Sequence, residues 1–196
     1  MRVRSMLVVG LILWPALAGG QTANQPGGPE VMGTISISRL WDDESGLGTG
    51  VEGGTGVGYV WRRRLGLEAL IEGFRHERNF SSGVRFEAHG SRVLGKVTYY
   101  WSDRNVQPFA AGIAGVMQVT RRSEYPVERP GPGGMPLVIG TEVFENEYTD
   151  LVWGGSGGLR IRVRERFALR PEGGLLVSAP DNFIEIRFGV TAIVRW

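Results

Sequence analysis

The feature that most constrains this chain is an alternation of apolar and polar residues with a period of two, which recurs from Val31 to the C-terminus. In segment 184–196, apolar residues occupy one set of alternate positions, and charged or small residues occupy most of the other. Successive side chains of a strand point to opposite faces of a sheet, so this period predicts a β-strand with one apolar face. No later segment shows a helical period of 3.6 residues, and the chain is therefore predicted to be all-β.

Seven earlier segments repeat this pattern, which gives eight predicted strands. The earlier seven are 31–41, 50–61, 65–76, 90–101, 107–119, 150–163 and 167–178. Short connections at 62–64, 102–106 and 164–166 alternate with longer ones at 42–49, 77–89, 121–149 and 179–182. Outer-membrane barrels have short periplasmic turns, longer outer loops and strands of about 10 residues. We therefore predict an eight-stranded antiparallel up-and-down transmembrane β-barrel.

Composition excludes several other classes of protein. The chain contains 31 glycines among 196 residues and no cysteine, so it has neither a disulfide scaffold nor a thiolate metal site. A hydrophobic content of 42% is too high for intrinsic disorder. After the N-terminus, no run approaches the roughly 18 apolar residues that a membrane helix needs. No residue pattern indicates a cofactor or a metal ion.

Residues 1–20 are predicted to form a cleavable signal peptide. A basic start and an apolar stretch lead to a small-residue cleavage site after Ala18 or Gly20. Residues 21–30 then form a short linker, and 31–196 form the barrel. Because the signal carries two arginines and no acid, its removal lowers the formal net charge from +2 to zero. No nucleic-acid partner is therefore expected.

The polar faces of the predicted strands carry charged side chains interleaved with glycine and alanine. Small residues leave space in a narrow lumen, whereas a water-facing surface has no need of them, so this face is predicted to point inward. The charges would then pair and plug the lumen, and a gated ion path is the alternative. The predicted lumen charges are Glu52, Glu68, Glu72, Arg92, Lys96, Arg160, Arg162, Arg170, Glu172, Glu185, Arg187 and Arg195. The lumen glycines are Gly54, Gly56, Gly58, Gly112, Gly154, Gly158 and Gly174.

The apolar faces carry aromatic residues close to the short turns. Amphipathic rings favour the interface between membrane and water, so these residues are predicted to form a girdle on the periplasmic side. A soluble lipocalin-like carrier, the alternative, would bury its apolar face inside. The predicted girdle consists of Tyr59, Trp61, Tyr99, Trp101, Phe109, Phe167 and Trp196.

With its signal sequence, eight alternating strands, short turns and terminal Trp196, the chain resembles the small outer-membrane barrels of the OmpA transmembrane domain and OmpX type over 31–196. The resemblance implies a bacterial outer-membrane location, a monomer, and contact with outer-membrane lipid and lipopolysaccharide. It also implies a C-terminal signal for the outer-membrane assembly machinery, formed by Val190, Ala192, Val194 and Trp196. The chain departs from the family in having Trp rather than Phe at the end, and Thr191 where glycine is frequent.

The connection 121–148 is the main functional candidate. We predict a hairpin that extends the fifth and sixth strands above the membrane, with Pro130 to Gly134 at its tip. Long loops are usually functional or disordered, and an exposed apolar face here could bind a surface partner. The alternative is that the hairpin packs on its own barrel rim. The outer connections are acidic, which would also permit bridging by divalent cations to lipopolysaccharide.

An enzymatic function is the rival hypothesis. His89-Gly90-Ser91 has the H-x-S spacing of barrels that deacylate lipid A, but Arg92 stands where that family has Asn. The nearest later acid, Asp103, falls in a periplasmic turn, too far away to orient the histidine. His76 has no partner at a metal-ligand spacing. We therefore expect no enzymatic activity.

Overall fold

The structure is a computed structural model that describes residues 27–41, 46–61, 64–80, 82–102, 104–130, 136–180 and 183–196. The predicted signal peptide 1–20 and the linker as far as residue 26 lie outside these residues. Among the described residues, no helix is long and apolar enough to cross a membrane.

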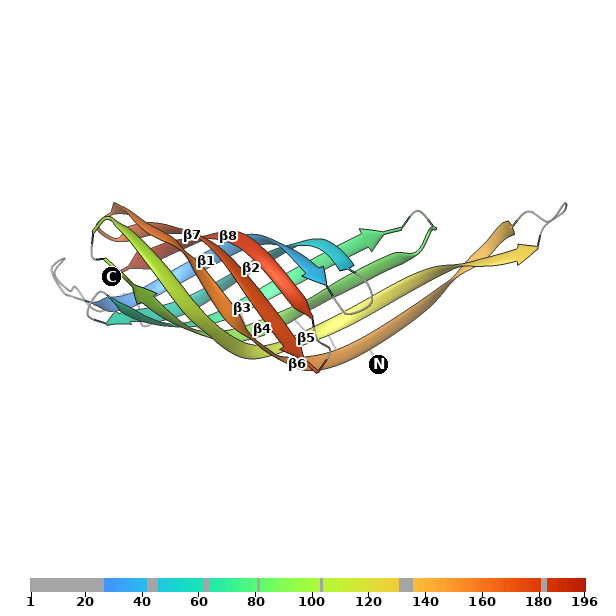
Figure 1. Cartoon of the computed structure of the whole chain (residues 1–196), viewed down its shortest axis with the longest axis horizontal. Helices are drawn as coiled ribbons and strands as arrows, with labels where there is room; N and C mark the ends of the chain where they lie inside the picture. The colour runs from blue at the N-terminus through green and yellow to red at the C-terminus, as the bar shows by residue number, and fades with distance from the viewer. Residues whose placement is uncertain are drawn as a thin grey trace.

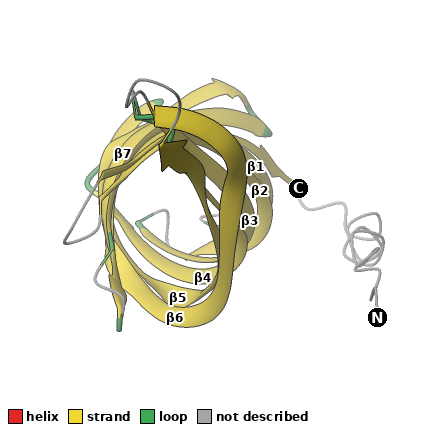
Figure 2. Cartoon of the chain, turned by 90° about the vertical axis from the view of Figure 1, so that its right-hand side faces the viewer, coloured by secondary structure: helices red, strands yellow, loops and turns green. Residues whose placement is uncertain are grey.

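Eight antiparallel strands close into one ring, as Figures 1 and 2 show. The ring closes where the first strand pairs with the last. This confirms the predicted all-β, eight-stranded up-and-down barrel. The strands are β1 (Gly28–Trp41), β2 (Gly46–Trp61), β3 (Leu65–Asn79), β4 (Arg85–Tyr100), β5 (Val106–Pro130), β6 (Pro136–Arg164), β7 (Phe167–Ala179) and β8 (Ile184–Arg195).

Several strands are longer than the sequence pattern indicated. β1 begins at Gly28, because Gly28 pairs with Val60 in β2 and Glu30 pairs with Arg195 in β8. The last three residues of the predicted linker therefore belong to the barrel. β5 and β6 remain paired up to Pro130 and Pro136, so most of the predicted outer hairpin is regular sheet. In Figure 1 this hairpin projects beyond all the other strands. We call this end of the barrel the hairpin end and the opposite end the turn end.

The strands are staggered around the ring. From Arg39 in β1, strand pairs lead through β2, β3, β4 and β5 to Glu145 in β6. In the other direction they lead through β8 and β7 to Gly155, ten residues further along β6. A closed barrel needs such a stagger because its strands tilt against the axis. Rows of neighbouring residues therefore rise obliquely toward the hairpin end from β1 to β6.

The outward face is a continuous apolar belt. Ile35 and Phe188 have relative accessibilities of 69% and 62%, and most other outward positions in the belt are also large and apolar. Toward the hairpin end the outward face becomes polar, beginning with Arg75 in β3 and His89 in β4. A closed barrel satisfies its backbone hydrogen bonds internally, so it can place such a belt in lipid. The barrel therefore spans a membrane through this belt.

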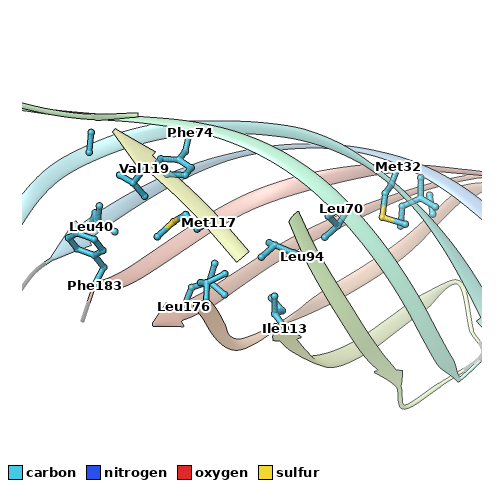
Figure 3. Packing of buried hydrophobic residues seen from close by; sticks show 14 residues of the cluster. Met32, Leu40, Leu70, Phe74, Leu94, Ile113, Met117, Val119, Leu176 and Phe183 are labelled. Carbon is cyan, nitrogen blue, oxygen red and sulfur yellow. The ribbon is translucent and has the colours of Figure 1, made fainter. Parts of the chain in front are cut away.

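The lumen contains apolar as well as charged side chains, and Figure 3 shows part of this apolar set. The fully inward apolar residues include Met32, Leu70, Leu94, Ile113, Met117, Leu176 and Ile193. They come from most of the strands and lie among the buried charged side chains. The lumen is therefore a mixed core rather than a purely polar one.

The predicted orientation of β5 was wrong. Phe109 is 2% exposed and points into the lumen, where Lys96 and Arg170 lie 5.4 and 5.5 Å from its ring centre. Phe109 therefore does not belong to the aromatic girdle. Gly112, predicted to line the lumen, faces outward with open space above it. On this strand the outward residues are small, so the face richer in apolar side chains is the inner one.

Candidate functional site

The ion-pair layer nearest the hairpin end is centred on Arg92. Its guanidinium group donates to Glu52 at 2.7 Å, to Glu72 at 2.8 Å and to Glu185 at 2.7 Å. Arg187 donates to the same oxygen of Glu72 at 2.8 Å. All five side chains are at most 5% exposed. Charge-assisted bonds of this geometry fix the side chains across the lumen, since they come from β2, β3, β4 and β8.

A second layer lies further toward the turn end. Arg170 binds both carboxylate oxygens of Glu68, at 2.6 and 2.8 Å, and Thr98 donates to Glu68 at 3.1 Å. Lys96 donates to Glu172 at 2.6 Å. Arg170 also lies 3.2 Å from Glu172, which links the two pairs. This layer joins β3, β4 and β7 through the interior.

The third layer lies at the turn end and is organised by Glu30. Arg160 and Arg195 both donate to the same carboxylate oxygen of Glu30. Arg160 also donates to the hydroxyl of Tyr100 at 3.4 Å, and Tyr100 is fully buried. Because Glu30 belongs to β1 and Arg195 to β8, this layer fastens the closure of the barrel.

The lumen mouth at the hairpin end has polar contacts apart from the three ion-pair layers. Ser38 and the Nε2 atom of the fully buried His76 are 2.7 Å apart. Ser178 donates to Asp150 at 2.9 Å, and the ring of Phe183 stacks near Tyr148 with 5.9 Å between centroids. No group of three or more potential metal ligands occurs in the described part of the chain. The mouth is therefore a packed end of the core.

The three layers place six glutamates against five arginines and one lysine. Removing one partner from such a buried network leaves an uncompensated charge, which is strongly destabilising. An eight-stranded barrel is only wide enough for side chains to fill it. The arrangement can therefore seal the lumen, and it holds positively and negatively charged side chains in fixed positions.

Most of the predicted lumen charges participate in these layers. Arg162 is half-buried near the turn end, and Arg195 is partly exposed there. Glu30, His76 and Asp150 are buried in the lumen but were absent from the predicted set. Continuing the alternation of β1 backward from Thr34 would have placed Glu30 inward. The same rule would have placed His76 beyond Glu72.

Six of the seven predicted girdle aromatics lie on the outward face at the turn end. Tyr59, Trp61, Tyr99 and Trp101 are exposed there, and Phe167 and Trp196 are partly exposed. Val190, Ala192 and Val194 of β8 also face outward, as the alternation required. The role of the aromatic residues at the membrane interface and that of β8 in assembly remain predictions.

Each strand of the outer hairpin has one edge that continues beyond its pairing with the neighbouring barrel strand. β4 pairs with β5 only as far as Glu124, and β7 pairs with β6 only from Leu151. Above these points each strand of the hairpin is paired only with the other in the described part of the chain. The exposed edge of β6 therefore runs over 136–150.

The inner face of the same hairpin carries an aromatic groove of about 480 Å³. Tyr125 lies between Phe86 and Phe144, with ring centroids 6.0 and 5.9 Å away in edge-to-face geometry. Arg121, Ser123 and Asn146 complete the lining. These contacts between β4, β5 and β6 stiffen the base of the hairpin.

His89 and Ser91 lie on the outward face of β4, at the edge of the apolar belt. His89 Nδ1 is 3.9 Å from Glu87, which is bound more closely by Arg75 at 3.0 Å. The acid beside His89 thus precedes it on the same strand, whereas the sequence argument considered only acids that follow it. The geometry adds an electrostatic contact for His89 at the rim.

No protein-family model and no curated protein matches the chain in sequence. Solved structures do match its fold. The attachment invasion locus protein Ail of Yersinia pestis, in complex with the heparin analogue sucrose octasulfate, aligns with a TM-score of 0.57 and 13% identity. Neisserial surface protein A aligns with a TM-score of 0.53 and 12% identity. Each alignment covers 88% of this chain and 100% of the other.

Both matched structures are small eight-stranded outer-membrane barrels. The match extends over the same ring of strands that carries the apolar belt and the charged lumen. The chain therefore has the fold of the small outer-membrane β-barrels of the OmpA and OmpX type.

Proposed function

We propose that this protein is a non-enzymatic outer-membrane barrel with a sealed lumen, which acts at the cell surface by binding an extended, basic segment of a partner to the open edge of β6. The observation that carries this proposal is the unpaired side of β6 over 136–150. The two matched structures are of an attachment invasion protein and a surface protein, which supports a surface role.

The β6 edge is suited to accept another strand. Unpaired N–H and C=O groups along a strand edge are a template for main-chain hydrogen bonds with an extended segment. No proline interrupts segment 137–150. The strand is already held extended by its pairs with β5, from Val119↔Tyr148 to Pro130↔Pro136, with one register shift between Val127 and Glu128.

The corresponding edge of β5 is blocked. Pro126 and Pro130 lie above the last pair with β4, and proline has no N–H to donate. The ring of Pro126 also lies about 3.5 Å from where a Cβ on Gly83 would stand, so the turn between β3 and β4 approaches this edge. Within the residues that the structure describes, the β6 side of the hairpin is therefore the one left open to a partner.

Charge favours a basic partner over a second copy of this chain. β6 carries Glu142, Glu145 and Glu147 along its exposed segment, and no basic residue occurs between 137 and 150. Two β6 edges in antiparallel pairing would bring glutamates close together, which is destabilising. Lysine or arginine side chains on an incoming strand would instead lie opposite these acids.

Binding of synthetic peptides to the refolded barrel in detergent micelles tests this proposal. The probe is an extended ten-residue peptide in which lysine alternates with threonine, and the control replaces each lysine with glutamate. Fluorescence anisotropy should detect binding of the basic peptide alone. The double substitution E145K/E147K, at two acids on the same face of β6, should reverse this preference, whereas R122E on β5 should not.

Single prolines separate edge pairing from simple charge attraction. Backbone N–H groups of consecutive residues point to opposite sides of a strand, so Thr141→Pro and Glu142→Pro remove donors from different edges of β6. One variant should lose peptide binding while limited proteolysis still finds an intact hairpin. Equal binding by both proline variants, or by the acidic peptide, would refute the proposed edge.

A further inference from the structure

We propose that the first ion-pair layer, the one nearest the hairpin end, binds one proton, which Glu52 and Glu185 share. The pair then acts as a pH-sensitive lock on the barrel interior, because loss of the proton leaves two adjacent carboxylates that repel each other. The site lies inside the barrel, so it does not depend on the proposed binding at the edge of β6.

The charges of the first layer do not balance. Among the described residues, the three carboxylates of Glu52, Glu72 and Glu185 are paired with two cations, Arg92 and Arg187. Arg187 also lies 3.9 Å from a carboxylate of the second layer, so the two layers share it. One negative charge is thus left over among side chains that are at most 5% exposed. A buried carboxylate without a partner generally takes up a proton rather than remain charged.

The other two layers do not supply the missing positive charge. In the second layer, two glutamates are matched by one lysine and one arginine. The surplus cation of the lumen lies in the third layer, where Arg160 and Arg195 share Glu30. Because the balanced second layer separates the two ends of the lumen, this surplus does not neutralise the first layer.

The hydrogen bonds of the first layer identify the carboxyl groups that hold the proton. One oxygen of Glu72 accepts from Arg92 and from Arg187, both at 2.8 Å, which stabilises Glu72 as an anion. Glu52 and Glu185 each accept from Arg92 through their Oε2 atoms, at 2.7 Å. In the described part of the chain, no group donates to their buried Oε1 atoms. These two carboxyl groups are therefore the ones with an oxygen left over.

Glu52 and Glu185 also lie within hydrogen-bonding reach of each other. Two carboxylates can only accept hydrogen bonds, whereas a protonated carboxyl group has an O–H to donate. A single proton between them therefore converts a repulsive contact into a hydrogen bond. It also makes the net charge of the layer zero, while Arg92 holds one oxygen of each group in place.

Apolar neighbours surround Glu185 on both sides. Strand pairs place it between Leu40 of β1 and Leu176 of β7, which are both buried and appear in Figure 3. Within its own strand, the next inward residue is Arg187, which donates to Glu72. Arg92 is thus the cation bound to Glu185, and it is already shared with two other carboxyl groups.

His76 is the other titratable group beside this pair in the part of the chain that the structure describes. Glu52 faces Ser36 and Ser38 of β1, and Ser38 lies 2.7 Å from Nε2 of His76. The Nδ1 atom of this fully buried ring has no hydrogen-bond partner among the described residues. A protonated imidazole has two N–H donors, so a proton on His76 would leave one donor buried and unsatisfied. The carboxyl pair is therefore the better site for the proton.

Infrared spectroscopy of the refolded full barrel in detergent tests for the proton directly. At neutral pH, the wild-type protein should show the carbonyl stretch of a protonated carboxyl group, which is separate from the carboxylate and amide bands. E185Q and E52Q should each remove this band, because either change leaves two carboxylates for two arginines. E68Q, the same substitution in the balanced second layer, should retain the band.

The pH dependence of unfolding provides a second test. Above about pH 5, the glutamates of the unfolded chain are ionised, so the folded protein holds one proton more than the unfolded chain. Relative to E185Q, the unfolding equilibrium constant of the wild type should rise by up to about tenfold per pH unit until this proton is lost. E185Q lacks the rise because its amide N–H replaces the proton in the contact with Glu52.

The variants separate proton binding from a general loss of stability. E68Q should be less stable than the wild type and yet keep the wild-type pH dependence. Absence of the infrared band at neutral pH, or its persistence in both E185Q and E52Q, would overturn the proposal. A pH dependence that is the same in wild type and E185Q but changes in H76Q would place the proton on His76 instead and would also overturn it.

Discussion

Arginine–glutamate pairs occur both inside the barrel and on the outer face of the extended sheet, in different surroundings. Inside, Arg92 meets three carboxylates and is completely buried. Outside, Arg122 and Glu124 lie 2.8 Å apart, with side chains 44% and 25% exposed. The distances are alike, so distance alone does not tell how much a pair contributes to the stability of the folded barrel. Burial decides it, because a buried charge cannot recover hydration when its partner is removed.

The largest effect is expected from Arg92→Met. This change leaves Glu52, Glu72 and Glu185 with less positive charge in a buried layer, and we expect it to lower the free energy of unfolding by about 3–5 kcal/mol. Guanidinium unfolding in lipid vesicles, followed by tryptophan fluorescence, measures this loss. Adding E52Q and E185Q should restore part of the stability. A loss below about 1 kcal/mol would show that this layer behaves like a surface pair.

The contrast between buried and exposed positions also applies to the phenylalanine side chains Phe109 and Phe188. Phe109→Ala removes a buried lumen side chain and should cost about 3 kcal/mol. Phe188→Ala, at a lipid-facing position with 62% exposure, should cost much less because lipid fills the space. Unfolding of the two variants under identical conditions measures the difference. If Phe188→Ala were the more damaging change, the inward orientation of β5 would be contradicted.

Replacing both members of a buried pair should be far milder than removing one. E68M/R170M exchanges the bidentate pair of the second layer for apolar residues of similar size. Such exchanges are often neutral or stabilising, so we expect a change within about 1 kcal/mol, whereas each single change should cost about 3–5 kcal/mol. A double-mutant cycle supplies the measurement. Additive single effects would show that the two side chains are not coupled.

The smallest effect is expected at the surface. Arg122→Ala should change the unfolding free energy by less than about 1 kcal/mol, because exposed pairs contribute little. Raising the salt concentration should reduce even this difference. A loss comparable with that of Arg92→Met would remove the distinction between the two regions.

The strands and most of their faces were predictable because one residue in two must contact lipid. The rule failed on β5, where Ala110, Gly112 and Ala114 face outward and Phe109 and Ile113 face the lumen. Apolarity identifies the lipid side only when the opposite side is polar, and here the lumen contains an apolar layer. Glu30 was missed because Gly28 and Pro29 resemble a linker, although they pair with β2.

The candidate sites were less predictable than the fold. The hairpin followed from the length of the connection, although residues 131–134 of its predicted tip lie outside the described residues, and its open edge depends on where β7 stops pairing with β6. Gly53 and Gly73, for example, are neighbours although they lie on different strands. Their adjacency is set by strand register, and alternation along one strand does not reveal it.

The closure of the ring has a consequence for the time course of assembly. The bond from Arg195 to Glu30 joins residues 165 positions apart, and β1 has no partner on one side until β8 arrives. Contacts between such distant residues form slowly, because a long loop must close before they contribute. Until then β1 presents an open edge that could join another chain. Delaying β8 should therefore lengthen the interval in which the nascent barrel is prone to aggregation.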